Sequence, residues 1–276
     1  MAPGDVNVSH SDAAREFHAL HQKGLLILPN AWDAGSARLI EHAGAKAIAT
    51  SSAAVAWSLG YPDGEAIPPE ALLSTVRGIS RVVSVPVSVD LEGGYASSPQ
   101  AAGAFAARVV DVGAVGVNVE DGTESPDLLA GKIERIKQET RKAGFDLWIN
   151  ARVDVFLRKL KEGEEAYPET VARARRYREA GADSIFVPAA SGDALIARLV
   201  QGVGLPLNIL AWPGVPAAEK LKELGVRRLS AGSGIAKVVL NQVHAMSRAF
   251  LADGRSERFQ EGALGNPEIN RLMRRG

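Results

Sequence analysis

The chain has 276 residues, of which 46% are hydrophobic and 23% charged, a composition typical of a folded globular protein. This length suits one α/β barrel, which needs about 250 residues. Its 32 Lys and Arg residues balance 32 Asp and Glu residues, so no net charge favours binding to nucleic acid or to an anionic membrane. The absence of cysteine excludes disulfides, thiolate metal ligands and a cysteine nucleophile. A small molecule is therefore the expected ligand.

The N-terminal segment MAPGDVNVSHSDAAREF lacks the basic-then-apolar order of a signal peptide. No apolar run reaches the roughly 18 residues of a membrane span. We therefore expect a cytoplasmic protein that does not enter a membrane. None of the five histidines falls at the end of a predicted strand, so a histidine-rich metal site is not expected.

Short apolar runs alternate with helical patterns along most of the chain. Four of these runs follow a helix that ends in a small residue and glycine, a typical C-cap: AGAKAIATS, VGAVGVNVED, AGADSIFVP and LGVRRLSAG. The predicted strands lie at 25–28, within 43–51, at 85–89, within 112–121, at 146–150, within 180–188, at 205–209 and within 224–232. The predicted helices lie at 34–43, 67–80, 98–111, 128–143, 167–179, 191–200 and 216–223.

Eight such units predict an α/β fold of the (β/α)₈ barrel type. The alternative is a doubly wound open sheet, which seldom has so many evenly spaced units. No Pro- or Ser-rich linker divides the chain, so residues 1–276 are expected to form one barrel domain, with residues 233–276 as a C-terminal helical extension. The extension carries an apolar stripe that either its own barrel or a partner subunit should cover.

Acidic residues follow two neighbouring predicted strands, at the end of the barrel where functional residues gather. The segment SVDLEGGYA places Asp90 and Glu92 on the same side of a strand, because strand side chains alternate. The segment NVEDG adds Glu120 and Asp121 from the next strand. An oxygen-only set of this kind favours Mg²⁺, or Mn²⁺, although acids at strand ends also cap the following helices.

The next strand ends in WINARVD, which should point Asn150 and Arg152 into the mouth of the barrel. A guanidinium group there can bind a substrate carboxylate bidentately and stabilise a developing enolate oxygen, or it can form a structural ion pair with the nearby acids. The segment TSSAAVAWSLGYPDG is expected to be a long loop in which Ser51 and Ser52 allow backbone N–H groups to approach a substrate carboxylate.

With these residues in place, the sequence resembles the isocitrate lyase/phosphoenolpyruvate mutase superfamily from about Leu25 to Asn241. The segments that carry the resemblance are LPNAWDAGSARLIEHAGAKAIATSS, SLGYPDG, VPVSVDLEGGYA, GVNVEDG and WINARVD. The resemblance implies a Mg²⁺ ion served by Asp90, Glu92 and Glu120, directly or through water. It also implies that Ser51, Ser52 and Ala53 bind a substrate carboxylate, that Arg152 contacts substrate, and that Asp63 lies near the site. We expect Asp90 and Asn150 to contact substrate as well, and Arg152, Asp63 and Glu120 to be the catalytic groups.

Members of this superfamily commonly exchange a C-terminal helix between subunits, so the resemblance also implies a homo-oligomer, either a dimer or a tetramer. The chain departs from the lyases of the superfamily at three places. The stretch EDGTESPDLLAGK lacks their Lys-Lys/Arg-Cys-Gly loop, whose Cys protonates the product, and Ile48 and Pro188 replace residues that support substrate in relatives. The residue that would replace that Cys is not evident from the sequence.

The expected function is therefore that of a Mg²⁺-dependent enzyme acting on small 2-oxo or 2-hydroxy carboxylates through a metal-stabilised enolate, as a C–C lyase or a decarboxylase of an oxaloacetate-like acid. One alternative is P–C bond chemistry of the phosphoenolpyruvate mutase or phosphonopyruvate hydrolase type. Another is a protein that binds 2-oxo acids with little turnover. A third is a phosphate site at SAGSG, residues 230–234, although such glycine-rich turns also simply begin a helix.

Overall fold

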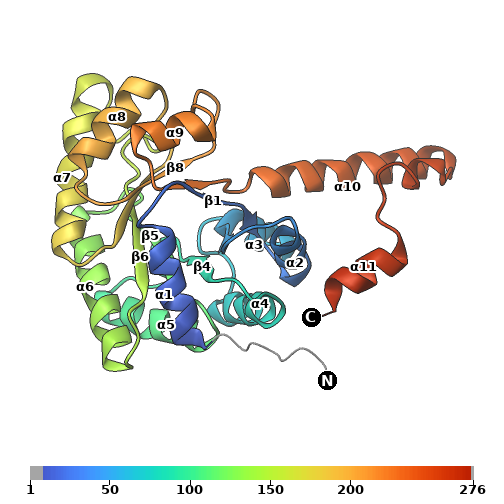
Figure 1. Ribbon diagram of the computed structural model, residues 1–276, viewed down its shortest axis with the longest axis horizontal. Coiled ribbons are helices and arrows are strands. Elements are labelled where there is room, and N and C mark those ends of the chain that lie inside the picture. Colours follow the sequence, from blue (N-terminus) through green and yellow to red (C-terminus); the bar gives the residue numbers. More distant parts are fainter. Residues whose placement is uncertain (1–8, 275–276) are drawn as a thin grey trace.

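The computed structural model describes residues 9–274 as a parallel barrel surrounded by helices (Figure 1). The two ends of the predicted domain, residues 1–8 and 275–276, lie outside the described residues. Within the described range, the strands are β1 Leu26–Leu28, β2 Asn30–Ala31, β3 Ile48–Thr50, β4 Val87–Asp90, β5 Gly116–Glu120, β6 Trp148–Arg152, β7 Ser184–Val187, β8 Leu207–Leu210 and β9 Arg228–Ser230. None of the helices in this range is both long and apolar enough to cross a membrane.

The strands pair in the order β1-β9-β8-β7-β6-β5-β4-β3-β2, and every pair is parallel. The first predicted strand is divided at Pro29 into β1, which pairs with β9, and β2, which pairs with β3. Because these two short strands adjoin along the chain, the ring of strands is nearly closed. The predicted barrel is confirmed, and the open-sheet alternative is wrong.

Eleven α-helices lie in the described part of the chain, and local sequence signals mark the starts of several of them. They are α1 His10–Leu20, α2 Ala34–His42, α3 Ser52–Ser58, α4 Pro69–Val82, α5 Pro99–Asp111, α6 Pro126–Lys142, α7 Ala166–Glu179, α8 Asp193–Gly202, α9 Ala218–Leu224, α10 Gly234–Asp253 and α11 Asn266–Met273. Ser98 and Ser125 cap α5 and α6, each followed by a proline at the first helical position, where a missing N–H is not costly.

Helix α1, which the sequence did not predict, packs against the N-terminal end of the barrel. Its Phe17 is fully buried, and the ring lies edge-on to Trp148 with centroids 6.2 Å apart. At the start of β5, a Cβ atom on Gly116 would lie only 2.6 Å from Cε1 of Phe17. The glycine therefore leaves the space that the Phe17 ring occupies.

This close approach predicts a coupled effect on stability. Gly116→Ala should lower the free energy of unfolding by about 1–3 kcal/mol, because the new methyl group overpacks against Phe17. In a Phe17→Ala background the same substitution should cost almost nothing. Chemical denaturation of the four proteins of this double-mutant cycle measures the coupling, and additive costs would show that Phe17 does not occupy this space.

A buried histidine next to Phe17 predicts that the stability of the protein depends on pH. His21 is 1% exposed, its Nδ1 lies 2.8 Å from the Phe17 carbonyl oxygen, and its ring stacks on Trp148. Burial, together with the positive charge of Arg228, lowers its pKa to about 3. Because the unfolded chain binds the proton near pH 6.5, this stabilisation is complete above that pH and is lost as the pH falls toward 3.

The stability advantage of the native chain over His21→Gln should therefore shrink by about 2 kcal/mol between pH 7 and pH 5. Urea denaturation of both proteins at the two pH values measures this difference. A constant difference would contradict the prediction.

The segment after β3 differs from the expected loop. Residues Ser52–Ser58 form helix α3, and four consecutive residues of it, Ala53–Ala56, are buried. Their small side chains allow the helix to lie close to the barrel, and alanine has the highest helix propensity. Only the part from about residue 59 to residue 68 is a loop.

The C-terminal helices leave the barrel. Figure 1 shows α10 extending away from it, and only Ala236 of α10 is buried. Helix α11 returns to α2, where Nε of Arg38 donates a 2.7 Å hydrogen bond to the Leu272 carbonyl oxygen. The apolar residues of α10 remain exposed, namely Ile235, Val238, Val239, Leu240, Val243, Phe250 and Leu251. The barrel of this chain does not cover the stripe, and coverage by a partner subunit stays a prediction.

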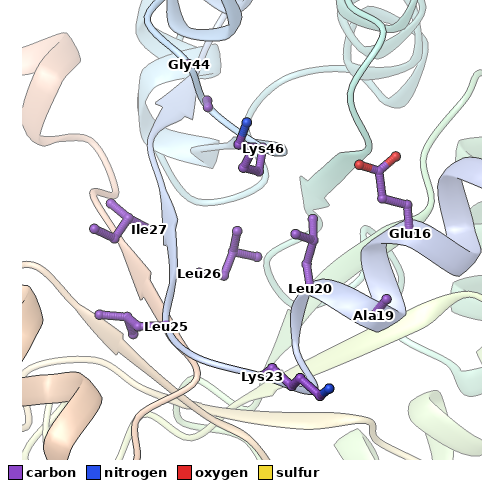
Figure 2. A pocket seen from close by; sticks show the side chains of 10 residues that line it. Glu16, Ala19, Leu20, Lys23, Leu25, Leu26, Ile27, Gly44 and Lys46 are labelled. Carbon is purple, nitrogen blue, oxygen red and sulfur yellow. The ribbon is translucent and has the colours of Figure 1, made fainter.

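A hollow of about 470 Å³ lies beside the N-terminal ends of β1 and β3 (Figure 2). Its walls include Leu20, Leu25 and Ile27, with Glu16, Lys23 and Lys46 at its edges. In barrels of this type, functional residues gather at the opposite end of the strands, and the N-terminal end contributes mainly to stability. The functional site is therefore expected at the C-terminal ends of the strands.

Candidate active site

Three carboxylates converge at the C-terminal ends of β4 and β5. Asp90 is the last residue of β4, and Glu120 is the last residue of β5. The Glu120 N–H donates a 2.8 Å hydrogen bond to the Glu92 carbonyl oxygen, which ties the two strand ends together. The Glu92 N–H lies 3.5 Å from Oδ1 of Asp90. The predicted grouping of these acids at the mouth of the barrel is present.

Asp90 and Glu92 lie close together for a different reason than the predicted alternation of side chains along one strand. The strand ends at Asp90, and Glu92 lies beyond it in a left-handed conformation with φ of 49°. Non-glycine residues rarely adopt this conformation, and it marks a position that the surrounding contacts impose. Two contacts hold the Glu92 carboxylate: the Glu65 N–H donates to it at 2.8 Å, and the Tyr95 hydroxyl donates at 3.1 Å.

Glu65 and Tyr95 are therefore site residues that the sequence prediction missed. Oε1 of Glu65 also accepts a 2.9 Å hydrogen bond from the Tyr95 N–H, so the loop after α3 and the turn after β4 are joined. Glu65 follows the recognised YPDG segment and Tyr95 ends the recognised SVDLEGGY segment. Their closeness in sequence to the recognised segments could have pointed to them as site residues. No local pattern indicated that they contact each other.

The three acids lack sufficient positive charge around them. Burial, followed by the negative charge of Asp90, raises the pKa of Glu92 to about 7. Burial raises the pKa of Glu120 to about 8, although Arg152 opposes this effect. Oε2 of Glu120 lies 2.5 Å from Nη1 of Arg152 but has no hydrogen bond of good geometry. Because burial raises the pKa of both acids even with Arg152 present, a further cation beside them would be favourable.

Arg152 is the last residue of β6 and forms ion pairs on two sides. Its Nε and Nη2 donate to the two carboxylate oxygens of Asp154, at 2.6 and 3.0 Å, and Nη1 faces Glu120. Burial lowers the pKa of Arg152, but the negative charges of Glu120 and Asp154 outweigh this effect. The net pKa is raised, so the guanidinium stays charged. The predicted bidentate grip on a substrate is not available in this arrangement, because Asp154 occupies the fork. Only Nη1, on the side of the acids, points to the mouth.

The predicted carboxylate cradle lies beside Asp90. Ser51 is the residue before α3, and Ser52 and Ala53 begin the helix. The Ser52 N–H donates a hydrogen bond to Oδ2 of Asp90 at 3.2 Å, and the Asp90 N–H donates one to Oγ1 of Thr50 at 2.9 Å. The first N–H groups of a helix have no partner within the helix and favour an anionic group.

Two other predicted residues lie elsewhere. Asn150 has no exposed surface, and its amide is engaged by Asn118 at 2.8 Å and by Ser184 at 2.7 Å. It faces the barrel interior as predicted, but two residues below Arg152, or about 6.6 Å deeper, so it does not reach the mouth. Asp63 is exposed on the loop after α3, and its charge contributes to the raised pKa of Glu92.

A cavity of about 560 Å³ opens next to the acids. Glu92 and Glu120 line it, and so do two cations that the sequence analysis did not single out, Lys132 from α6 and Arg158 from the turn after β6. Nζ of Lys132 donates a 2.6 Å hydrogen bond to the Gly93 carbonyl oxygen. The remaining residues of the lining are Gly64, Glu65, Gly93, Ala96, Ser97, Asp121, Gly122, Thr123, Glu124, Leu128 and Leu129.

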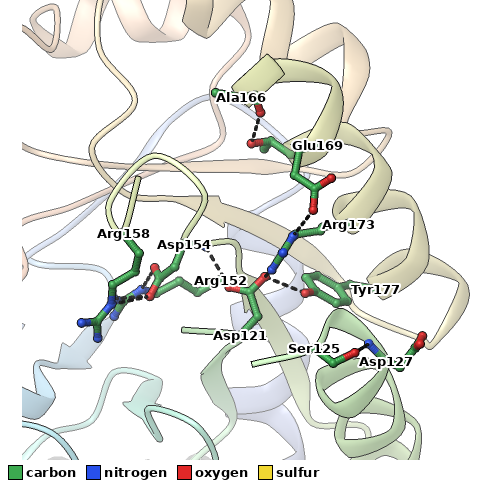
Figure 3. A network of polar contacts seen from close by, with 11 residues as sticks. Asp121, Ser125, Asp127, Arg152, Asp154, Arg158, Ala166, Glu169, Arg173 and Tyr177 are labelled. Atoms are coloured by element: carbon green, nitrogen blue, oxygen red, sulfur yellow. Dashed lines mark hydrogen bonds and ion pairs between the residues drawn. The ribbon is translucent and has the colours of Figure 1, made fainter. Parts of the chain in front are cut away.

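A second polar network supports the floor of this site (Figure 3). Asp121 is 2% exposed and accepts hydrogen bonds from Arg173 at 2.9 Å and from Tyr177 at 2.6 Å, both on α7. Its other oxygen accepts a 2.9 Å hydrogen bond from the Asp154 N–H. Asp121 therefore fixes the backbone that carries Asp154, and Asp154 fixes Arg152.

The residues present fit a Mg²⁺ ion of the water-rich kind. Among residues 9–274, no three His, Cys, Asp or Glu side chains are gathered closely enough to hold an ion by themselves. Mg²⁺ usually keeps several waters and takes only one or two carboxylates directly. The all-oxygen donor set of Asp90, Glu92 and Glu120 matches this requirement.

Comparison with known proteins agrees with the barrel. The sequence model of the phosphoenolpyruvate phosphomutase family matches residues 17–251. An uncharacterized protein of Mycobacterium tuberculosis is 38% identical over 222 residues, covering 79% of this chain and 81% of that protein. The 2-methylisocitrate lyase of Escherichia coli is 28% identical over 256 residues, covering 87% of this chain and 82% of the lyase.

Among solved structures, a phosphonopyruvate hydrolase in complex with oxalate and Mg²⁺ superposes with a TM-score of 0.83, covering 94% of each chain. Its identity to this chain is 22%, so the likeness concerns the fold. The fold and the family match define a (β/α)₈ barrel of the lyase and mutase class. The chain belongs to the isocitrate lyase/phosphoenolpyruvate mutase superfamily.

Proposed function

We propose that this protein is a Mg²⁺-dependent enzyme that breaks or forms the bond next to the carbonyl carbon of a small 2-oxo or 2-hydroxy carboxylate, as a C–C lyase or decarboxylase. The observation that carries the proposal is the convergence of Asp90, Glu120 and Arg152 at the ends of three consecutive strands. Superfamily membership supports enzymatic action on small carboxylates.

Asp90, Glu92 and Glu120 are the residues that would hold Mg²⁺, or Mn²⁺, directly or through water, and the bound ion would supply Lewis-acid polarisation of the oxo group. The Ser52 N–H at the start of α3 donates to Asp90, and the neighbouring N–H groups of this helix start are suited to bind the substrate carboxylate. These contacts would orient the acid so that its oxo group faces the three carboxylates.

Arg152 is suited to stabilise the negative charge that develops on the oxo oxygen when the adjacent bond breaks. Asp154 holds the Nε and Nη2 side of its guanidinium, so the Nη1 side is fixed toward Glu120. A fixed donor is more effective than a mobile one, because it does not reorganise during the reaction. The proposed catalytic groups are therefore Arg152 and Glu120, with Asp63 on the adjoining loop.

The segment between β5 and α6 contains only residues 121–125. It does not form an extended cover over the cavity, and the chain has no cysteine to protonate a product. Phosphorus–carbon bond chemistry is the second candidate function, because the matching family model is that of a phosphomutase.

Binding of oxalate, a planar dianion that mimics the enolate of a 2-oxo acid, tests the proposal by calorimetry. We expect oxalate to bind in the presence of Mg²⁺ or Mn²⁺ and not in the presence of a chelator. Turnover of oxaloacetate, 2-methylisocitrate and phosphonopyruvate is then followed by pyruvate release, and conversion of phosphonopyruvate to phosphoenolpyruvate is measured separately. Oxalate binding that is absent or indifferent to Mg²⁺ would refute the metal site, and tight binding without turnover would favour a binding protein.

A further inference from the structure

Arg158 is a cation at the cavity that the proposed chemistry does not use. It lies in the turn that follows β6, lines the cavity, and its side chain is 51% exposed. Its Nε lies 3.6 Å from Oδ2 of Asp154, which is longer than a hydrogen bond. Figure 3 shows Arg158 beside Asp154, on the side away from Asp121.

The contact between Arg158 and Asp154 is weak and easily given up. Arg158 is half exposed while Asp154 is buried, and an ion pair of this length with one solvated partner contributes little to stability. Asp154 also does not need it, because both of its carboxylate oxygens already accept hydrogen bonds from Arg152. The guanidinium of Arg158 can therefore turn to another anion without leaving a buried charge uncompensated.

The other cations at the site are already engaged. Arg152 is held on both sides by Asp154 and Glu120. Lys132 is mostly buried and donates to the Gly93 carbonyl oxygen, and burial lowers its pKa. Of the cations described at this cavity, Arg158 has the most accessible donors, and its planar fork matches a carboxylate or a phosphonate.

The position of Arg158 relative to the acids gives it a specific role. A continuous line of contacts runs from Glu120 to Arg152, from Arg152 to Asp154 and from Asp154 to Arg158. A substrate whose oxo-carboxylate end lies at Asp90 and Glu120 would extend along this line. Its far end would then approach Arg158, while the acids lining the rest of the cavity would repel an anionic group.

We propose that Arg158 binds the second acidic group of the substrate, so that the enzyme selects dianionic oxo acids over singly charged ones such as pyruvate. This inference rests on the proposed function, because it requires the oxo-carboxylate end to bind at the three acids. The second group is a carboxylate or a phosphonate, both of which the guanidinium fork binds through two oxygens.

The test compares the native protein with Arg158→Gln and Arg158→Lys, all saturated with Mg²⁺. Calorimetry measures binding of oxalate, pyruvate, oxaloacetate, 2-oxoglutarate and phosphonopyruvate; kcat/KM replaces affinity for any acid that is turned over. We expect Arg158→Gln to reduce the preference for dianionic acids over pyruvate by about 10- to 100-fold. This is the change in affinity that loss of one hydrogen bond to a charged group typically causes. Oxalate affinity should change by less than about twofold.

Arg158→Lys should recover only part of the preference, because lysine lacks the fork. Arg141→Gln, an exposed arginine at the end of α6, is the matched control and should leave the preference unchanged. The acid that loses most affinity in Arg158→Gln identifies the second group as a carboxylate or a phosphonate. An unchanged preference with normal oxalate binding would overturn the inference alone, whereas loss of Mg²⁺-dependent oxalate binding in the native protein would overturn the proposed function.

Discussion

Replacing Asp90 with Asn is expected to abolish Mg²⁺-dependent binding of oxalate and all turnover. The substitution removes one negative charge from the set that would hold the ion, while Asn can still accept the hydrogen bond from the Ser52 N–H. Changes to mere supporting partners of metal ligands already lower metal affinity by about 10- to 100-fold, so loss of a ligand should cost at least about 100-fold. Calorimetric titration of Mg²⁺ in the presence of oxalate measures this loss.

Asp111→Asn is the matched control for this substitution. Asp111 is exposed at the end of α5, which leads into the N-terminal end of β5, opposite the acids, and its substitution should leave both Mg²⁺ affinity and turnover unchanged. Thermal unfolding of both variants checks that each is folded. An Asp90→Asn protein that binds Mg²⁺ and oxalate with native affinity would show that the acids only cap neighbouring elements.

Replacing Arg152 with Met should reduce both stability and turnover. Asp154 is fully buried and Glu120 is nearly so, and both would lose their ion-pair partner. Breaking a buried pair from one side typically costs about 3–5 kcal/mol. Loss of a fixed donor at the reacting oxygen should lower kcat by about 100- to 1,000-fold. Chemical denaturation and initial rates measure the two effects separately.

Arg152→Lys distinguishes the structural role from the catalytic one. Lysine keeps the positive charge, so most of the stability should remain, but it cannot satisfy Asp154 and face Glu120 at the same time. We expect this variant to be folded at 25 °C and still strongly impaired in kcat. Native kcat in either folded variant would restrict Arg152 to a structural role.

Asp154 contacts two arginines, Arg152 closely and Arg158 at a longer distance, so the two sides of the site are held with different firmness. Asp121 and the α7 residues Arg173 and Tyr177 hold the backbone at Asp154. Arg152 is fixed through that anchor, whereas Arg158 is attached to it only loosely. A fixed charge at the reacting end and a mobile one at the far end suit one common reaction step with a variable second group.

Much of the barrel was predictable because its signals are local. The predicted strands within 112–121 and 180–188 contain β5 and β7, and glycine C-caps mark the helix that precedes each of them. The helix α3 was missed because its serine- and alanine-rich sequence also reads as a loop, and only packing against the barrel decides between the two. Helix α1 was missed because its packing depends on Phe17, which fills the space at Gly116. This contact joins residues that are distant in sequence.

The sequence by itself determined the order of the strands and which groups end them, because apolar periodicity and the direction of parallel strands place Asp90, Glu120 and Arg152 at one end of the barrel. Only the tertiary structure decided how those groups are used. Three features of the site depend on contacts between separate loops. They are the left-handed conformation of Glu92, the hydrogen bonds from Arg152 to Asp154, and the loosely held guanidinium of Arg158. Such contacts leave no periodic pattern in the sequence, since each is set by the three-dimensional positions of the loops that the barrel brings together.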